Sequence, residues 1–180
     1  AAAQLLAEAQ ASGLLHAAAT SWPQPPQRLW RWVFITTTTT LYVIAGRGKA
    51  TVVRWLSGFT GWLMSDGWFA YRDYPHRLRC WAHLLRKAQG LVECDDPDGR
   101  AFGHRVRTTL EDLMIAIYAA REGPPNGQAV PLPRAFARPL DLLRQAATAR
   151  LRHRHAKTQA LAVELLNDGE AIYAVLHHPE

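Results

Sequence analysis

Apolar side chains recur at every second position in the middle of the first half of the chain. Trp30, Trp32 and Phe34 share this spacing, and the β-branched and aromatic residues around them favour an extended backbone. We therefore predict a strand over residues 30–35 with one buried face, and a second strand over the apolar residues 41–45. The threonine tract between them predicts two strand ends that flank a hairpin turn.

Shorter apolar runs precede and follow this strand pair. Residues 14–15 begin a short buried strand, which we expect to end at Trp22 and Pro23, before the turn-forming prolines at 25–26. The apolar residues 62–64 predict another buried strand, which ends in a Ser-Asp-Gly sequence.

The period changes to that of an amphipathic helix over residues 52–59. Apolar side chains recur there three, four and seven positions apart, and the pattern stops near Gly58. The other elements predicted in this half are a helix, a short strand and a second helix, over residues 1–11, 77–81 and 82–89. This order of strands and helices fits a mixed α/β layer built on one sheet.

The second half of the chain has an almost wholly helical pattern. The Asp- and Pro-rich residues 95–99 predict a turn, and Thr108 followed three residues later by Glu111 is typical of a helix start. The proline-rich residues 124–133 predict a connector to a long basic helix that begins at about Pro139.

The last apolar stripe lies on both sides of Gly169 and predicts one or two further amphipathic helices. The predicted fold class is therefore α/β, with a mixed-sheet domain over residues 1–91 and a mostly helical sub-domain over residues 92–180. A length of 180 residues suits one domain, or one domain with an inserted sub-domain, and is enough to bury a core.

The composition excludes several classes of protein. With 48% hydrophobic and 20% charged residues, the chain is not of the disordered class. No apolar run approaches the roughly 20 residues that span a bilayer, and no signal-peptide pattern opens the chain, so no membrane partner is expected. Two cysteines are too few for a disulfide framework, which makes a reducing cytoplasm the expected location.

The positive charge points to a polyanionic partner. The chain carries 21 Lys and Arg against 15 Asp and Glu, and residues 134–157 alone hold seven cations and one anion, which equals the whole excess of +6. On a helix, Arg150, Arg154 and Lys157 would share one face and could follow a nucleic-acid backbone. A solvated helix face is the alternative interpretation.

Asp66 is the strongest single candidate for chemistry. A carboxylate directly after an apolar strand is held rigidly at the edge of a sheet, where it could bind a hard cation. The Asp66-Gly67 pair is also typical of a simple turn, which is the commoner role of this local sequence.

A second group of candidates begins at Cys80. Cys80 and His83 have the spacing of metal ligands, and Cys94 with His104 could complete a four-ligand zinc site. The second pair lacks a zinc-knuckle pattern, so a buried cysteine and a partly buried histidine are the favoured alternative. The same segment ends with two cations that suit contacts with phosphate as well as with solvent, Arg86 and Lys87.

Other nucleotide and hydrolase signatures are absent from the sequence. It contains no phosphate-binding loop, dinucleotide fingerprint or Gly-x-Ser-x-Gly elbow, and Gly46-Arg47-Gly48-Lys49 is too short to count as one. Tryptophans such as Trp32 and Trp62 occupy core-like positions, so packing is favoured over base stacking as their role. We therefore expect no small-molecule substrate.

These motifs resemble the transposases of insertion sequence 66, a bacterial family of DDE type. The resemblance is carried by segments at residues 15–22, 30–34, 63–71 and 80–87, and near the end at 155–158 and 166–176. Its most specific parts are Ser65-Asp66-Gly67 and Cys80-Trp81-Ala82-His83.

The resemblance implies an RNase H-like catalytic fold with a helical insertion, DNA as the partner, and transposition as the function. In such enzymes three carboxylates hold two Mg²⁺ ions, which activate the attacking water or 3′-hydroxyl and stabilise the leaving oxygen. Asp66 matches the second of these carboxylates, both as catalytic residue and as metal ligand. A homo-oligomer in a bacterial cytoplasm is also in keeping with the resemblance.

The chain departs from the family pattern at two positions. The first acid belongs to a His-x-Asp-Glu-Thr strand, where this chain has His16-Ala17-Ala18-Ala19-Thr20, so Ala18 occupies a ligand position and offers no oxygen. The third acid is expected just after Glu180, and neither Glu93 nor Glu180 matches it. Because one carboxylate cannot hold two metal ions, we predict that these residues alone are catalytically inactive.

Two further hypotheses use the same residues. The chain could be a non-enzymatic DNA-binding or oligomerisation module that uses the basic residues 134–157. A metal-dependent nuclease acting on RNA–DNA hybrids would need the same missing carboxylates, and we rank it last.

Overall fold

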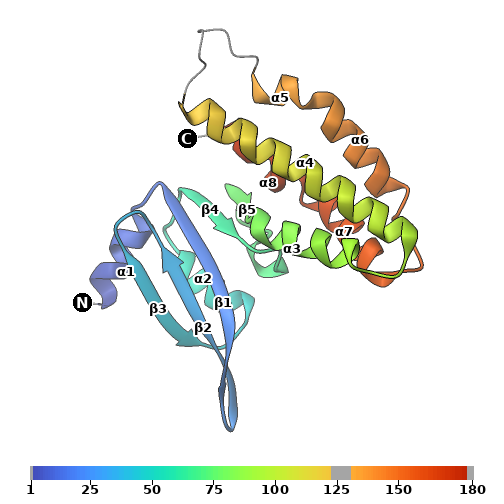
Figure 1. Cartoon of the computed structure of the whole chain (residues 1–180). Helices are drawn as coiled ribbons and strands as arrows, with labels where there is room; N and C mark the ends of the chain where they lie inside the picture. The colour runs from blue at the N-terminus through green and yellow to red at the C-terminus, as the bar shows by residue number, and fades with distance from the viewer. Residues whose placement is uncertain (1, 123–130, 178–180) are drawn as a thin grey trace. The chain divides into compact units, whose positions relative to one another are not determined.

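The computed structural model describes residues 2–122 and 131–177 of the chain (Figure 1). Its contacts divide the chain into two compact units, Ala1–Cys80 and Trp81–Glu180, which we call the sheet unit and the helical unit. Each unit has its own hydrophobic core, and the two cores share no buried residue. The predicted domain boundary after residue 91 stays a prediction; by their contacts, residues 81–92 go with the helical unit.

The sheet unit confirms the predicted α/β class with one mixed sheet. Its described elements in chain order are α1 (Ala2–Gln10), β1 (Leu14–Gln24), β2 (Gln27–Ile35), β3 (Thr40–Ala45), α2 (Lys49–Leu56), β4 (Trp62–Ser65), the 3₁₀ helix η1 (Phe69–Tyr71) and β5 (Arg77–Arg79). The five strands are ordered β3-β2-β1-β4-β5. The pairs β1–β2 and β2–β3 are antiparallel, whereas β1–β4 and β4–β5 are parallel. The central strand β1 therefore joins an antiparallel half to a parallel half.

One face of this sheet carries the core of the unit, together with residues from α1, α2 and η1. Trp32 and Phe34 are almost fully buried, at 0% and 2% exposed, and their rings stack with centroids 6.4 Å apart. Ala17 of β1 and Leu63 of β4 lie in the same cluster, as does Val52 of the predicted amphipathic helix. The alternation expected over residues 30–35 is thus confirmed.

The strands β1 and β2 extend further than the sequence predicted. They pair from His16 opposite Ile35 to Gln24 opposite Gln27, so β1 continues through Trp22 and Pro23, whereas the predicted turn at residues 25–26 is confirmed. Proline is compatible with a strand where its missing N–H is not needed by a third strand. Pro23 meets this condition because β1 has no second strand neighbour there.

The threonine tract forms a turn rather than two strand ends. β2 ends at Ile35 and β3 begins at Thr40, which is the only threonine of the tract inside a strand. The Thr36 hydroxyl accepts hydrogen bonds from the backbone N–H of Thr39 at 2.9 Å and of Thr38 at 3.3 Å. A side chain that satisfies turn N–H groups in this way outweighs the strand preference of threonine. The hairpin itself is confirmed.

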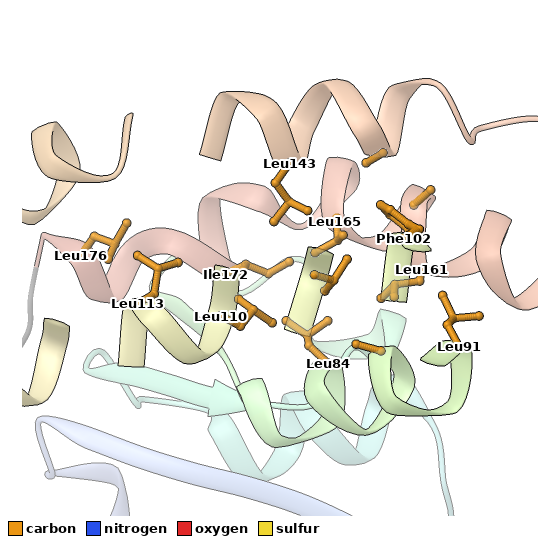
Figure 2. Packing of buried hydrophobic residues seen from close by; sticks show 14 of the residues in the cluster. Leu84, Leu91, Phe102, Leu110, Leu113, Leu143, Leu161, Leu165, Ile172 and Leu176 are labelled. Carbon is orange, nitrogen blue, oxygen red and sulfur yellow. The ribbon is translucent and has the colours of Figure 1, made fainter. Parts of the chain in front are cut away.

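The helical unit is built entirely from helices and connecting turns in its described part. Its elements are α3 (Trp81–Val92), α4 (Pro97–Glu122), α5 (Leu132–Ala135), α6 (Ala137–Thr148), α7 (Ala156–Asn167), α8 (Gly169–Tyr173) and the 3₁₀ helix η2 (Ala174–Leu176). Figure 2 shows its apolar core, to which α3, α4, α6, α7 and α8 all contribute side chains. The helices predicted on both sides of Gly169 are confirmed. None of the described helices has the length and apolar character needed to cross a membrane.

The longest helix, α4, begins at Pro97 and not at Thr108. Asp96 Oδ2 accepts a hydrogen bond from the backbone N–H of Gly99 at 2.7 Å, which caps the helix, and Pro97 occupies its first position. The predicted turn over residues 95–99 and the predicted helix start at Thr108 are therefore wrong. An acidic residue followed by proline marks a helix start as well as a turn, and the pair Thr108 and Glu111 lies inside the helix.

The basic residues 134–157 do not form one long helix. α6 begins at Ala137, two residues before the predicted start, and it ends at Thr148; the chain then turns before α7 begins at Ala156. Arg150 and Arg154 lie in that turn, so the predicted helical stripe of Arg150, Arg154 and Lys157 is wrong. Most of the predicted proline-rich connector, residues 124–130, lies outside the described residues.

The turn after α6 is held by acidic residues from the start of α4. The Arg150 guanidinium donates to the Ala146 carbonyl at 2.9 Å and pairs with the Asp98 carboxylate. His153 Nε2 lies 3.1 Å from Asp98 Oδ2 and 3.6 Å from Asp96 Oδ2. These partners are about 50 residues away in the chain, which is why the local charge pattern did not reveal the turn.

Candidate functional site

Asp66 follows directly after β4, an interior strand that ends at the buried Ser65. Its Oδ1 atom accepts a hydrogen bond from the backbone N–H of Trp68 at 2.9 Å, the bond of an Asx turn. The residue is half-buried. Both sequence-based interpretations therefore agree with its position, since Asp66 closes a turn and its carboxylate stands at the end of an interior strand.

The register of the sheet brings Ala18 next to Asp66. β1 and β4 are parallel, and their last paired residues are Ala17 and Ser65, so the next position on each chain is Ala18 and Asp66. Neighbouring strands lie about 4.8 Å apart, which is close enough for side chains at these positions to share a ligand. Ala18 is exposed, and its methyl group offers no oxygen.

Arg47 lies between two tryptophan rings close to this turn. Its guanidinium carbon is 4.0 Å from the ring centroid of Trp30 and 4.6 Å from that of Trp68, within the range of cation–π attraction. Trp68 is also the residue whose N–H binds Asp66. Residues 46–49 are too short for a phosphate loop, and this exposed cation was not among the predicted site residues; two separated tryptophans were its only signal in the sequence.

The charges of Asp66 and Arg47 both act on the pKa of Tyr71. Its hydroxyl is buried and has no hydrogen-bond partner among the described residues, and its ring meets that of Trp68 edge-on at 5.7 Å. Burial, and after it the negative charge of Asp66, raise the pKa of the phenol well above its usual range, whereas Arg47 acts in the opposite direction. Tyr71 is therefore protonated at neutral pH, and Asp66 and Arg47 lie within electrostatic range of the same group.

The residues around Asp66 do not fit the pair of Mg²⁺ ions that the family resemblance implies. In the part of the chain that the structure describes, no group of three or more His, Cys, Asp or Glu side chains could hold a metal ion. Mg²⁺ prefers several oxygen ligands, and the neighbouring strand position holds Ala18. Glu93 belongs to the helical unit, where Gln89 donates to it at 2.5 Å, and Glu180 lies outside the described residues.

The Cys80-Trp81-Ala82-His83 motif spans the boundary between the two units. The Cys80 N–H donates to the Ser65 carbonyl at 2.9 Å, next to Asp66 in the chain. In the helical unit, Trp81 Nε1 donates to the Ile172 carbonyl at 2.8 Å and so fastens the start of α3 to α8. Cys80 and Cys94 are half-buried free thiols, His83 is half-buried, and no zinc cluster forms among the described residues.

Three of the predicted DNA-binding residues come together in the helical unit. Arg86 and Lys87 of α3 and Lys157 of α7 line one hollow of about 370 Å³. Its wall also includes Glu164, whose carboxylate lies 2.5 Å from the Lys87 ammonium group. With three cations and one carboxylate in its wall, the hollow presents a net positive charge.

The other two predicted DNA-binding residues do not belong to this hollow. The Arg150 side chain is only 18% exposed and stacks over the ring of Phe102 at 5.0 Å, in addition to its pairing with Asp98. The Arg154 side chain is 90% exposed and lies 3.8 Å from Asp96. The turn thus presents Arg154 to solvent, whereas Arg150 serves the packing of the helical unit.

A family model matches nearly the whole chain. The family model described as Transposase IS66 family matches residues 1–174, a range that includes Ala18, Asp66 and the Cys80 motif. Neither the curated proteins nor the solved structures gave a match. The match extends over nearly all of both units, and the chain therefore belongs to the IS66 family of transposases.

Proposed function

We propose that the sheet unit is an RNase H-like transposase core and that the chain binds transposon DNA. The parallel pairing of β1 with β4 supports this proposal, because it brings Ala18 beside Asp66, the two residues that the family resemblance assigns to the first and second acid positions. The five-stranded mixed sheet agrees with such a core. A homo-oligomer and a bacterial cytoplasmic location stay predictions from the sequence.

Under this proposal the chain binds DNA but does not cleave it. Metal-assisted strand transfer requires several carboxylates around the reacting phosphate, and the shared position here holds one carboxylate and one methyl group. Asp66 would keep its turn-closing role, and Arg47 would offer a positive charge near the turn to a DNA phosphate.

Binding and cleavage can be measured separately on the same chain. Fluorescence anisotropy with a mixed-sequence 30-base-pair duplex should show binding at low salt that weakens steeply as salt is raised. A supercoiled plasmid incubated with Mg²⁺ or Mn²⁺ should stay intact. Nicking of the plasmid by these residues would overturn the proposed inactivity, and absence of duplex binding at low salt would overturn the DNA-binding role.

A second candidate function is DNA binding through the helical unit alone. The observation that favours it is the hollow lined by Arg86, Lys87 and Lys157. If this hollow holds a DNA backbone, Lys157→Gln should weaken duplex binding and lower its salt dependence by about one phosphate contact. The matched control is Arg105→Gln, an exposed cation of α4 outside the hollow, and equal effects of the two substitutions would exclude the hollow.

A further inference from the structure

The end of the β1–β2 hairpin is a two-stranded ribbon that no other strand supports. β4 pairs with β1 only at residues 14–17, and β3 pairs with β2 only at residues 30–35. Residues 20–28 are all exposed, and Figure 1 shows the hairpin projecting past the neighbouring strands. Three register pairs make up this ribbon, which we define as residues 22–29: Trp22–Leu29, Pro23–Arg28 and Gln24–Gln27.

The ribbon belongs to a long stretch of chain without acidic residues. No Asp or Glu occurs between Glu8 and Asp66, whereas this stretch contains five cations: Arg28, Arg31, Arg47, Lys49 and Arg54. Arg28 lies on the ribbon and Arg31 at its base. Across the described residues, neither of these two arginines has a carboxylate within ion-pair distance. The ribbon is therefore a protruding, positively charged element.

The pleat separates the polar side chains of the ribbon onto two faces. Gln24 and Gln27 form one register pair, and alternation places both on the face that carries Arg31. The Arg31 guanidinium lies 5.7 Å from the Trp22 ring centroid, which orders this face. Arg28, one position away from Gln27, belongs to the opposite face. Glutamine can pair with the major-groove edge of adenine, and arginine neutralises phosphates.

We propose that this ribbon enters a groove of duplex DNA, with Gln24 and Gln27 toward the base edges and Arg28 and Arg31 toward phosphates. The inference rests on the DNA-binding function proposed above and adds the element that makes the contact. The major groove of B-DNA, about 12 Å wide, admits a two-stranded β-ribbon. A polyanion is favoured as the occupant because the projecting surface has cations and no acidic residue to balance them.

The test compares the full chain with two variants and one control. In the first variant, Arg28→Ser and Arg31→Ser remove two cations. In the second, Asn-Gly replaces residues 22–29, so that Ser21 still pairs with Trp30 across a two-residue turn. The control carries Arg54→Ser and Arg105→Ser, which remove the same charge from exposed positions outside the ribbon. Circular dichroism checks folding, and anisotropy on the mixed-sequence 30-base-pair duplex measures affinity at several salt concentrations.

We expect the double substitution to weaken binding about tenfold or more at low salt and to reduce the salt slope by roughly two, while the control stays near the parent chain. The shortened hairpin should keep its circular dichroism spectrum and lose at least as much affinity. If it fails to fold, the double substitution decides alone. Equal losses in the double variant and the control would overturn the ribbon contact and leave the proposed function intact. Absence of binding by the parent chain would overturn both.

Discussion

The sheet unit and the helical unit handle their charged residues in different ways. The sheet unit has eight Lys and Arg against three Asp and Glu, whereas the helical unit has 13 against 12. In the helical unit, cations pair with carboxylates of the same unit, as Lys87 does with Glu164 and Arg150 with Asp98. In the sheet unit, Lys49 pairs with Asp73, but Arg31 and Arg47 stack on tryptophan rings. The unit that looks less basic along the sequence therefore holds most of the excess charge.

This difference shows that a basic segment is not the same as a basic surface. Residues 134–157 contain seven cations and one anion, but the acids that balance some of them lie near residue 97, at the start of α4. Conversely, five of the eight cations of the sheet unit lie over residues 28–54 with no acid among them in the chain, and of these five only Lys49 has an ion pair in the described part of the chain, with Asp73. Only the cations that are not already paired with carboxylates of the same fold are available to bind an anionic partner.

Whether the two units are independent can be tested by damaging one core and following the stability of the other unit. Leu110 is fully buried in the helical unit, so Leu110→Ala should cost about 3 kcal/mol of unfolding free energy through lost packing and a residual cavity. Hydrogen exchange should rise across α3, α4 and α7 and stay unchanged in β1 and β2. Equal loss of protection in both units would show that the two cores do not act separately.

A second test asks whether Arg150 serves the fold and not a partner. Arg150→Met removes the ion pair with Asp98 and the bond to Ala146, and should cost about 2 kcal/mol in urea unfolding. Duplex affinity should change less than twofold. The control, Arg152→Met, changes an exposed neighbour and should alter stability by less than about 0.5 kcal/mol. A large loss of affinity with unchanged stability would reverse the assignment.

A third test concerns metal binding at the positions of Ala18 and Asp66 in the sheet unit. Ala18→Asp places a second carboxylate beside Asp66, and should raise the affinity for Mn²⁺ about tenfold, or about 1.4 kcal/mol, in isothermal titration calorimetry. Thr20→Asp is the matched control, because it adds the same charge two positions further along the same face of β1. Equal affinities in the two variants would mean that the register does not bring the two positions together.

The smallest expected effect concerns Arg47. Arg47→Gln should weaken duplex binding about fourfold, because a cation held between Trp30 and Trp68 is presented at little entropic cost. Arg54→Gln serves as the control: Arg54 is also exposed, but it stacks only on the neighbouring Trp55 of the same helix. If both substitutions have the same effect, only total charge matters and the two-ring arrangement has no role.

Local sequence patterns predicted the structural features that depend only on neighbouring residues. The period of two at Trp32 and Phe34 identified a strand and its buried face, because alternation is a property of the strand itself. The predicted start at Thr108 was wrong because a capping pattern carries no information about the turns before it. The turn at Arg150 was missed because its partner, Asp98, lies 52 residues away.

The residues of the candidate site likewise differ in whether a local sequence pattern can identify them. Asp66 could be identified from its place after an apolar run, and its turn bond to Trp68 is equally local. The closeness of Asp66 to Ala18 depends on the register between β1 and β4, which no local pattern specifies. Arg47 could not be identified from a local pattern, since its stacking partners Trp30 and Trp68 lie on either side of it in the chain and meet only in the fold.

The two pairings of β1 also set an order of events during synthesis. β1 meets β2 through an adjacent turn, so this hairpin can close once residue 35 has left the ribosome. β1 meets β4 only across 48 residues, as Leu14 opposite Trp62 shows, so the position of Asp66 beside Ala18 must wait until residue 66 is available. A nascent chain would therefore expose its basic ribbon before it has assembled the end of the sheet where the acidic residue stands.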